Sequence, residues 1–343
     1  MSSPYITKQV RLLSRAILVS ALFAASCSPA KSPTPGVENE HLESRLAPGQ
    51  HTAVIDGVSI AYHVFGKGPV VMAHPGGPGG GWSYLRMPEV EKLATVVYVE
   101  PIGTGASGRL PNPADYSRER DASNVEGLRV HLGIEKLVLL GHSYGGFVAL
   151  EYALTYPDHL RGLILYDTSP TTGPDFDKDV ESNKAWFKNE SWYADATSAL
   201  DEMDSADTDE KVTTIFRRAV PLYVANWTGR HKEFEASVPP IQLYVERSHR
   251  QKANTPQIDL KGKLYDVRPR LGEIKASTLI VVGARDFICS EKMANVEHQG
   301  IPGSHLVVLQ NTGHIAHIET PHEFVQAIGE FLGQLGTEPT ASP

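Results

Sequence analysis

The segment from residue 136 to 154 restricts the fold of this chain more than any other feature. An apolar run is followed by Gly-His-Ser-Tyr-Gly, and then by a stretch with helical spacing. A strand, a sharp turn and a helix are therefore predicted, with Ser143 at the turn. Gly141 and Gly145 are small enough for the strand and the helix to pass closely beneath the serine. The hydroxyl of Ser143 is then expected to project above the end of a sheet.

Apolar or alternating runs recur along the chain, separated by segments with helical spacing. An Asp-Gly pair between the first two runs indicates a hairpin, and the others are short enough to be buried strands. Strands that alternate with helices favour the α/β class, here a mostly parallel eight-stranded sheet flanked by helices. Besides the run before Ser143, the expected strands cover residues 51–56, 58–65, 69–73, 95–99, 163–166, 277–283 and 305–309, and the clearest helices cover 119–132 and 321–335.

This alternation stops between residues 171 and 272, where helical patterns rich in aromatic residues replace the buried runs. We interpret this part as a helical cap inserted into a core made of residues 51–170 and 273–336. The acidic stretch 201–210 lacks the spacing of a calcium-binding loop, so we interpret it as a solvated helix face and connecting loop.

The N-terminus has the layout of an export signal. Three basic residues precede an apolar run at 16–25 that is too short for a good membrane span. The residues leading to Cys27 resemble a bacterial lipoprotein signal, which implies lipidation of Cys27 and removal of residues 1–26; a simple signal peptide cut nearby is the alternative. Residues 27–50 are predicted to be a flexible tether and 337–343 a disordered tail. The expected location is outside the cytoplasm, facing the periplasm or the cell exterior, with membrane contact only through the lipid anchor.

Charge and cysteine content exclude several classes of function. The net charge is −8, and removal of residues 1–26 takes away three basic and no acidic residues, leaving 29 Lys and Arg against 40 Asp and Glu, or −11. This balance argues against nucleic acid as a partner. Cys27 and Cys289 are the only cysteines, so no disulfide framework is possible. The 14 histidines show no metal-binding spacing, and neither a metal nor another cofactor is expected.

Three residues that follow predicted parallel strands suggest nucleophilic catalysis. A serine hydroxyl needs a base to take its proton, and the base needs a carboxylate to hold its tautomer. Ser143, Asp286 and His314 meet this need in the chain order Ser, Asp, His, at the sheet edge where open α/β sheets place their sites. Asp167 is the rival acid, since it also follows a strand, and His317 is the rival base.

A glycine-rich loop at residues 74–81 follows the third strand and can supply backbone N–H groups. In acyl-transfer enzymes such a loop gives one donor of the oxyanion hole, and the residue after the nucleophile, here Tyr144, gives the other. Gly77 is the first choice for the loop donor and Gly76 the second, because the two prolines of the loop lack an N–H. A phosphate-binding loop is disfavoured, since no Gly-Lys-Ser/Thr ending is present.

These motifs resemble the α/β-hydrolase fold superfamily over roughly residues 50–336. Within it, Pro-Gly-Gly-Pro-Gly at 75–79 is similar to the His-Gly-Gly-Pro-Gly loop of prolyl aminopeptidases, and Gly-His-Ser-Tyr-Gly-Gly at 141–146 fits their nucleophile turn. Asn-Thr-Gly-His at 311–314 with Glu-Thr-Pro at 319–321 resembles their histidine region. Two places depart from that pattern: the loop histidine is displaced to His74, and Glu-Pro-Ile-Gly at 100–103 stands where these peptidases usually have Asp-Gln-Arg-Gly.

The resemblance implies a serine exopeptidase that releases an N-terminal residue, typically proline, from a short peptide whose free amine is held by cap carboxylates. A carboxylesterase or lactonase is the alternative within the same mechanism, and a non-catalytic binding lipoprotein of the same fold is a remote one. The expected substrate is a small molecule or short peptide. No motif selects among the candidate amine-binding acids, which are Glu181, Glu190, Glu202, Glu233, Glu235 and Glu246.

Overall fold

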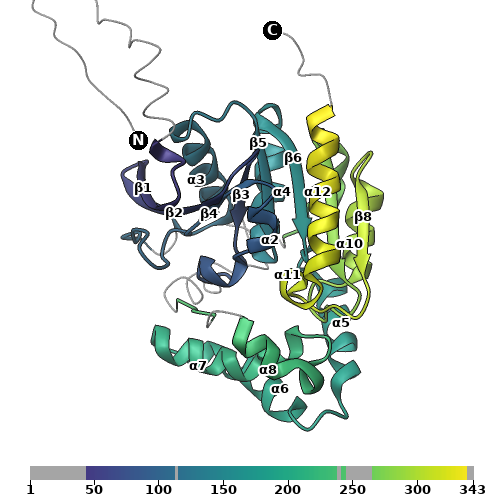
Figure 1. Ribbon diagram of the computed structural model, residues 1–343. Coiled ribbons are helices and arrows are strands. Elements are labelled where there is room, and N and C mark those ends of the chain that lie inside the picture. Colours follow the sequence, from purple (N-terminus) through teal and green to yellow (C-terminus); the bar gives the residue numbers. More distant parts are fainter. Residues whose placement is uncertain (1–43, 113–114, 238–240, 245–264, 338–343) are drawn as a thin grey trace, which may run out of the picture.

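The computed structural model describes residues 44–112, 115–237, 241–244 and 265–337 (Figure 1). An eight-stranded sheet forms the centre, with strand order β1-β2-β4-β3-β5-β6-β7-β8. β2 runs antiparallel to both of its neighbours, β1 and β4, and every pair from β4 to β8 in this order is parallel, which confirms the predicted fold class. The strands are β1 (Gly49–Ile55), β2 (Val58–Gly66), β3 (Val70–His74), β4 (Thr95–Val99), β5 (Leu137–His142), β6 (Leu160–Tyr166), β7 (Ser277–Gly283) and β8 (His305–Leu309).

The ends of the core differ slightly from the sequence expectation. The hairpin register pairs Gly49 with Val64, so β1 begins two residues before the expected start of the core at residue 51. At the other end, the last helix continues to Thr337, where the tail was expected to begin. Both differences arise because pairing or helical bonds continue past the last residue with a clear apolar pattern. The signal segment and most of the tether lie outside the described residues, as does the tail from residue 338.

Helices cover both faces of the sheet and divide the core into two apolar clusters. Val97 and Val99 of β4 point into the first cluster, and Val96 and Tyr98 point into the second, as strand alternation requires. The first cluster lies under α3 (Arg118–His131), α4 (Tyr144–Thr155) and α10 (Glu291–Gly300), and the second lies under α2 (Pro88–Glu91) and α12 (Pro321–Thr337).

Four α-helices of the cap lie beyond one end of the sheet, between β6 and β7 in the chain (Figure 1). Buried apolar residues of the cap, among them Ala199, Val212 and Ile215, join the second cluster of the core, so the cap closes over the strand ends. Within the described part of the chain, no helix is both long and apolar enough to cross a membrane. The described elements of the cap are α5 (Pro174–Lys184), η4 (Ala185–Phe187), α6 (Tyr193–Glu202), η5 (Met203–Ser205), α7 (Asp209–Ala219), η6 (Val220–Tyr223) and α8 (Trp227–Ser237), and η7 (Arg268–Glu273) leads back to the core.

Candidate active site

Ser143 lies in the sharp turn between β5 and α4 that the sequence predicts. Its φ of 55° and ψ of −122° lie outside the regions that serine normally adopts. Hydrogen bonds hold the strained residue on both sides: its N–H donates to the carbonyl of Tyr166 at 3.0 Å, and its carbonyl accepts from the Thr168 hydroxyl at 2.8 Å. A Cβ on Gly145 would lie 2.2 Å from the carbonyl oxygen of His74, so this position requires glycine.

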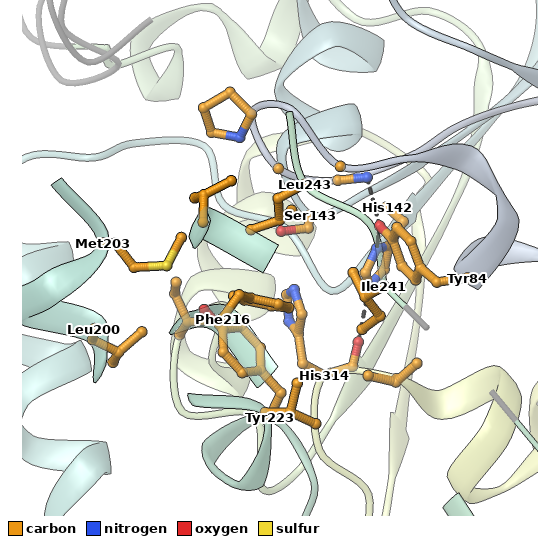
Figure 2. A pocket seen from close by; sticks show the side chains of 18 residues that line it. Tyr84, His142, Ser143, Leu200, Met203, Phe216, Tyr223, Ile241, Leu243 and His314 are labelled. Carbon is orange, nitrogen blue, oxygen red and sulfur yellow. Dashed lines mark hydrogen bonds between the residues drawn. The ribbon is translucent and has the colours of Figure 1, made fainter. Parts of the chain in front are cut away.

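His314 and Asp286 come together beside this turn. Asp286 follows β7, and its Oδ2 lies 2.7 Å from Nδ1 of His314. The second oxygen of Asp286 accepts the N–H groups of Ile288 and Cys289 at 2.9 and 3.1 Å, which fixes the carboxylate. His314 and Ser143 line the same cavity, and the imidazole points toward the serine (Figure 2). The three residues selected from the sequence therefore converge at the carboxyl ends of β5, β7 and β8.

The two rival residues have other partners. Asp167 accepts the N–H of Gly283 at 2.8 Å, and its other oxygen is buried without a hydrogen-bond partner among the described residues. Burial and the nearby charge of Asp286 raise the pKa of Asp167 well above its usual value, which favours the protonated form. Both ring nitrogens of His317 are engaged, by the hydroxyl of Tyr166 and the carbonyl of Tyr84, each at 2.8 Å. His317 is therefore not placed to act as the base.

The glycine-rich loop of residues 74–81, called the donor loop below, passes beside Ser143. The N–H of Gly76 donates to the hydroxyl of Tyr84 at 2.6 Å, so the second choice for the oxyanion donor is already engaged. Gly77 has a φ of +137°, and a Cβ there would lie 2.5 Å from the nitrogen of Gly79. Tyr144 is the first residue of α4, and the N–H groups at a helix start point outward along its axis.

A cavity of about 300 Å³ lies between the strand ends and the cap (Figure 2). Its walls are mostly apolar, and none of the described residues that line it is Asp, Glu, Lys or Arg. The cap supplies one side of the cavity with Leu200, Met203, Val212, Phe216, Val220 and Tyr223.

The cap carboxylates whose side chains are described lie away from this cavity. Glu181, Glu190 and Glu235 are exposed, and Glu202 pairs with Arg218 on the cap surface. The side chain of Glu233 and the whole of Glu246 lie outside the described residues. Glu100 is the first residue of the segment that departs from the peptidase pattern. Its buried carboxylate lies 3.0 Å from Nε2 of His63, within the core.

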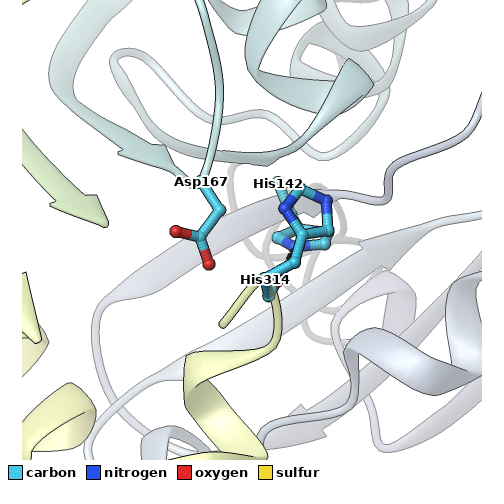
Figure 3. A group of neighbouring side chains, drawn as sticks. All are labelled: His142, Asp167 and His314. Carbon is cyan, nitrogen blue, oxygen red and sulfur yellow. Dashed lines mark hydrogen bonds between the residues drawn. The ribbon is translucent and has the colours of Figure 1, made fainter. Parts of the chain in front are cut away.

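Two groups of potential metal ligands lie near His314, and most of their ligand atoms already take part in hydrogen bonds. The first group is His142, Asp167 and His314 (Figure 3), and the second is Asp286, Cys289 and His314. Both ring nitrogens of His142, both oxygens of Asp286 and Nδ1 of His314 take part in hydrogen bonds. A metal ion would have to break these bonds, so neither group offers a prepared donor set.

Glu319 was not selected from the sequence, although it connects the base to the cap. One of its oxygens accepts the N–H of Gly313 and the other accepts the N–H of Ala225, both at 2.8 Å. The N–H of His314 donates to the carbonyl of Tyr223, also in the cap, at 2.8 Å. The segment 310–315, called the base loop below, is thus bonded to cap residues. The Glu-Thr-Pro sequence at 319–321 was the signal that could have revealed this role.

Comparison with known proteins establishes the class of the chain. A family model described as the alpha/beta hydrolase fold matches residues 69–321, and the chain belongs to this family. A solved alpha/beta fold hydrolase from Bacillus anthracis has a TM-score of 0.69 at 18% identity, covering 82% of this chain and 98% of the other.

Two curated relatives show which members of the family the chain resembles. It is 28% identical over 294 residues to a proline iminopeptidase of Saccharolobus solfataricus, covering 82% of this chain and 91% of the relative. It is 31% identical over 288 residues to the 2-hydroxy-6-oxo-6-phenylhexa-2,4-dienoate hydrolase of Comamonas testosteroni. This match covers 80% of this chain and 91% of the relative. The resemblance to prolyl aminopeptidases is confirmed, and it extends to hydrolases with other substrates.

Proposed function

We propose that this chain is a serine hydrolase that acts through an acyl-enzyme. The observation that carries the proposal is the 2.7 Å bond between Asp286 and His314 beside the strained turn of Ser143. In this mechanism Oγ of Ser143 attacks a carbonyl carbon, and Nε2 of His314 accepts the hydroxyl proton. Asp286 holds Nδ1–H of the imidazole and stabilises the imidazolium that forms.

The backbone N–H groups of Gly77 and Tyr144 then hold the oxyanion of the tetrahedral intermediate. Such donors are already in place before the reaction, and removing one typically costs about 10²–10³ in turnover. The imidazolium of His314 protonates the leaving group as the intermediate collapses. Water, activated by the same imidazole, attacks the acyl-enzyme and releases Ser143.

The cavity favours a neutral substrate with an apolar acyl group, namely a carboxylic ester or a lactone. Burying a charged ammonium in an apolar cavity is unfavourable unless a carboxylate pairs with it. No described residue lining the cavity supplies one, and the described cap acids lie elsewhere. The apolar walls instead gain free energy by covering methylene groups, about 0.8 kcal/mol for each group that is fully buried.

A prolyl aminopeptidase is the second candidate. It is supported by the loop and turn motifs and by the 28% identity to the enzyme from Saccharolobus solfataricus. In this case the amine would need a carboxylate from the part of the cap that includes Glu233 and Glu246.

Hydrolysis of a proline arylamide and of short-chain aryl esters by the purified full chain separates the two candidates, with Ser143→Ala as the blank. Ester cleavage without arylamide cleavage supports the ester or lactone hydrolase. Arylamide cleavage that disappears in Ser143→Ala assigns the exopeptidase. If a fluorophosphonate fails to label Ser143 and neither substrate is cleaved, the chain is a binding protein of the same fold.

A further inference from the structure

We propose that Tyr84 and His142 are positioning residues, which fix the donor loop and the base loop relative to Ser143 through three hydrogen bonds in series. The inference rests on the function proposed above and extends it to residues that do not react. Tyr84 belongs to η1 (Trp82–Leu85), and His142 is the last residue of β5. Both side chains line the cavity (Figure 2).

The series begins in the donor loop and ends in the base loop. The N–H of Gly76 lies 2.6 Å from the hydroxyl of Tyr84. That hydroxyl lies 2.8 Å from Nδ1 of His142, and Nε2 of His142 lies 2.8 Å from the carbonyl oxygen of His314. All the groups are buried, so water does not compete for these bonds.

The carbonyl of His314, at one end of the series, determines which atom donates and which accepts in each of the three bonds. A carbonyl oxygen only accepts, so Nε2 of His142 must carry a proton. Burial and the neighbouring His314 lower the pKa of His142 well below its usual value, so the ring is neutral near pH 7 and Nδ1 is an acceptor. Tyr84 must therefore donate its hydroxyl proton to Nδ1, and its oxygen accepts from Gly76. All three bonds run in one direction, which strengthens each of them.

A second neutral histidine, His317, donates in the same way to the main-chain carbonyl of Tyr84. The carbonyl of Tyr84 accepts from Nε2 of His317 at 2.8 Å, and Nδ1 of His317 accepts from the hydroxyl of Tyr166, also at 2.8 Å. Burial lowers the pKa of His317 to about 4, so this ring is also neutral near pH 7. The carbonyl of Tyr166 in turn accepts the N–H of Ser143. Tyr84 is thus connected to the nucleophile turn by two routes, one through His142 and one through His317 and Tyr166.

The series also determines which donor-loop amide faces the substrate. Because the hydroxyl of Tyr84 accepts the N–H of Gly76, that amide is not available to the substrate, and the amide of Gly77 becomes the candidate donor of this loop. Removal of that hydroxyl would release Gly76 and leave Nδ1 of His142 without its donor. The donor loop and the base loop would then no longer be held in fixed positions relative to Ser143. Small displacements of reacting groups cost up to about 10² in rate.

Tyr84→Phe tests the proposal against Tyr98→Phe as a matched control. The buried hydroxyl of Tyr98 also accepts a backbone N–H, from Met87 at 2.7 Å, and lies 3.0 Å from an acceptor on Glu91, but Tyr98 does not line the cavity. Tyr84→Phe is expected to lower kcat by about 10–10² while KM stays within about threefold, and Tyr98→Phe to keep kcat within about twofold. Equal loss of kcat in the two variants, or a loss confined to KM, overturns the proposal. Where turnover is slow, the rate of fluorophosphonate labelling replaces kcat.

The tautomer of His142, measured by imidazole ¹⁵N NMR on the wild-type full chain, tests the series without any turnover. A neutral ring protonated at Nε2 near pH 7 supports the proposal, and a ring protonated at Nδ1 or at both nitrogens overturns it. Absence of labelling at Ser143 would contradict the proposed function alone, because the NMR result does not depend on reactivity. This measurement also keeps the proposal falsifiable if Tyr84→Phe does not fold.

Discussion

At the scale of single residues, Ser143 has a backbone conformation that is unfavourable for serine, at a cost of about 1–3 kcal/mol. The surrounding glycines and the hydrogen bonds with Tyr166 and Thr168 stabilise it in this conformation. Gly145 is one of the tight positions, because a Cβ there would lie 2.2 Å from the carbonyl oxygen of His74 and 2.7 Å from that of Pro75. The nucleophile turn and the donor loop are therefore in direct backbone contact.

Gly145→Ala should separate the donor loop from the nucleophile turn. We expect kcat/KM to fall by about 10², because the oxyanion donors move relative to Ser143. Unfolding free energy should fall by about 1–3 kcal/mol from overpacking. Gly333→Ala is the control, since nothing lies within 4 Å of a Cβ at that position of α12 and alanine favours helix. Full activity in Gly145→Ala would show that the donor loop does not depend on this contact.

Glu319 is a residue whose ionisation affects stability. Burial raises the pKa of Glu319 from its usual 4.5 to about 7, despite the two N–H groups that its oxygens accept. The folded protein therefore binds the proton more tightly than the unfolded chain. Between pH 4.5 and 7 the unfolded state releases this proton first, so stability falls as pH rises through this window.

Glu319→Gln should remove this pH dependence. The free energy of unfolding of the wild type, relative to that of the variant, is expected to fall by about 3 kcal/mol between pH 4.5 and 7 and to be constant above pH 7. Urea unfolding at pH 5, 6, 7 and 8 measures the difference. Glu323→Gln on the exposed start of α12 should leave the slope as in the wild type. A rise in the difference with pH would show that the sign is wrong.

At the scale of elements, residues 241–244 connect the cap to the donor loop. The N–H of Gly81 donates to the carbonyl of Gln242 at 2.8 Å, and the N–H of Tyr244 donates to the carbonyl of Gly79 at 2.9 Å. Leu243 pairs with Gly80 through its backbone, and its side chain lines the cavity. This short segment therefore forms part of the cavity wall and holds the donor loop.

Leu243→Ala should enlarge the cavity without removing its backbone bonds. If the substrate is an ester, kcat/KM for an octanoyl ester relative to a butanoyl ester is expected to rise by about tenfold, since even one methylene in a hydrophobic pocket corresponds to about 1–3 kcal/mol. Aryl esters of graded chain length measure this ratio. Leu93→Ala, on the exposed surface, is the control. An unchanged ratio in Leu243→Ala would place the acyl group elsewhere.

At the scale of the whole molecule, the sequence predicted the core more fully than the site. The eight strands, the cap and the convergence of Ser143, Asp286 and His314 follow from local patterns, because each of these residues lies within about five residues of the end of an apolar run. No local sequence pattern marks Tyr84 as part of the site. Its partner His142 is 58 residues away, and only the tertiary fold brings them together. The pairing at residues 241–244 was missed because four residues are too few to show a period.

The lipoprotein signal expected from the sequence leads to a prediction about the N-terminal segment. If Cys27 is lipidated as we propose, a clickable palmitate analogue should label the wild type in a bacterial host, and Cys27→Ser should abolish the label. Cys289→Ser is the control, because Cys289 is buried in the core and should not affect labelling. Label retained in Cys27→Ser would favour a simple signal peptide.

The backbone bonds between residues 79–81 and 242–244 limit how this fold can be recombined. A cap is usually treated as an exchangeable module, joined to the core where the chain enters and leaves it. Here a cap grafted from a relative would also have to pair with the donor loop, or the oxyanion donors would lose their support. Chimeras that exchange residues 79–81 together with the cap should therefore retain turnover, and those cut only at the insertion points should bind substrate but react slowly.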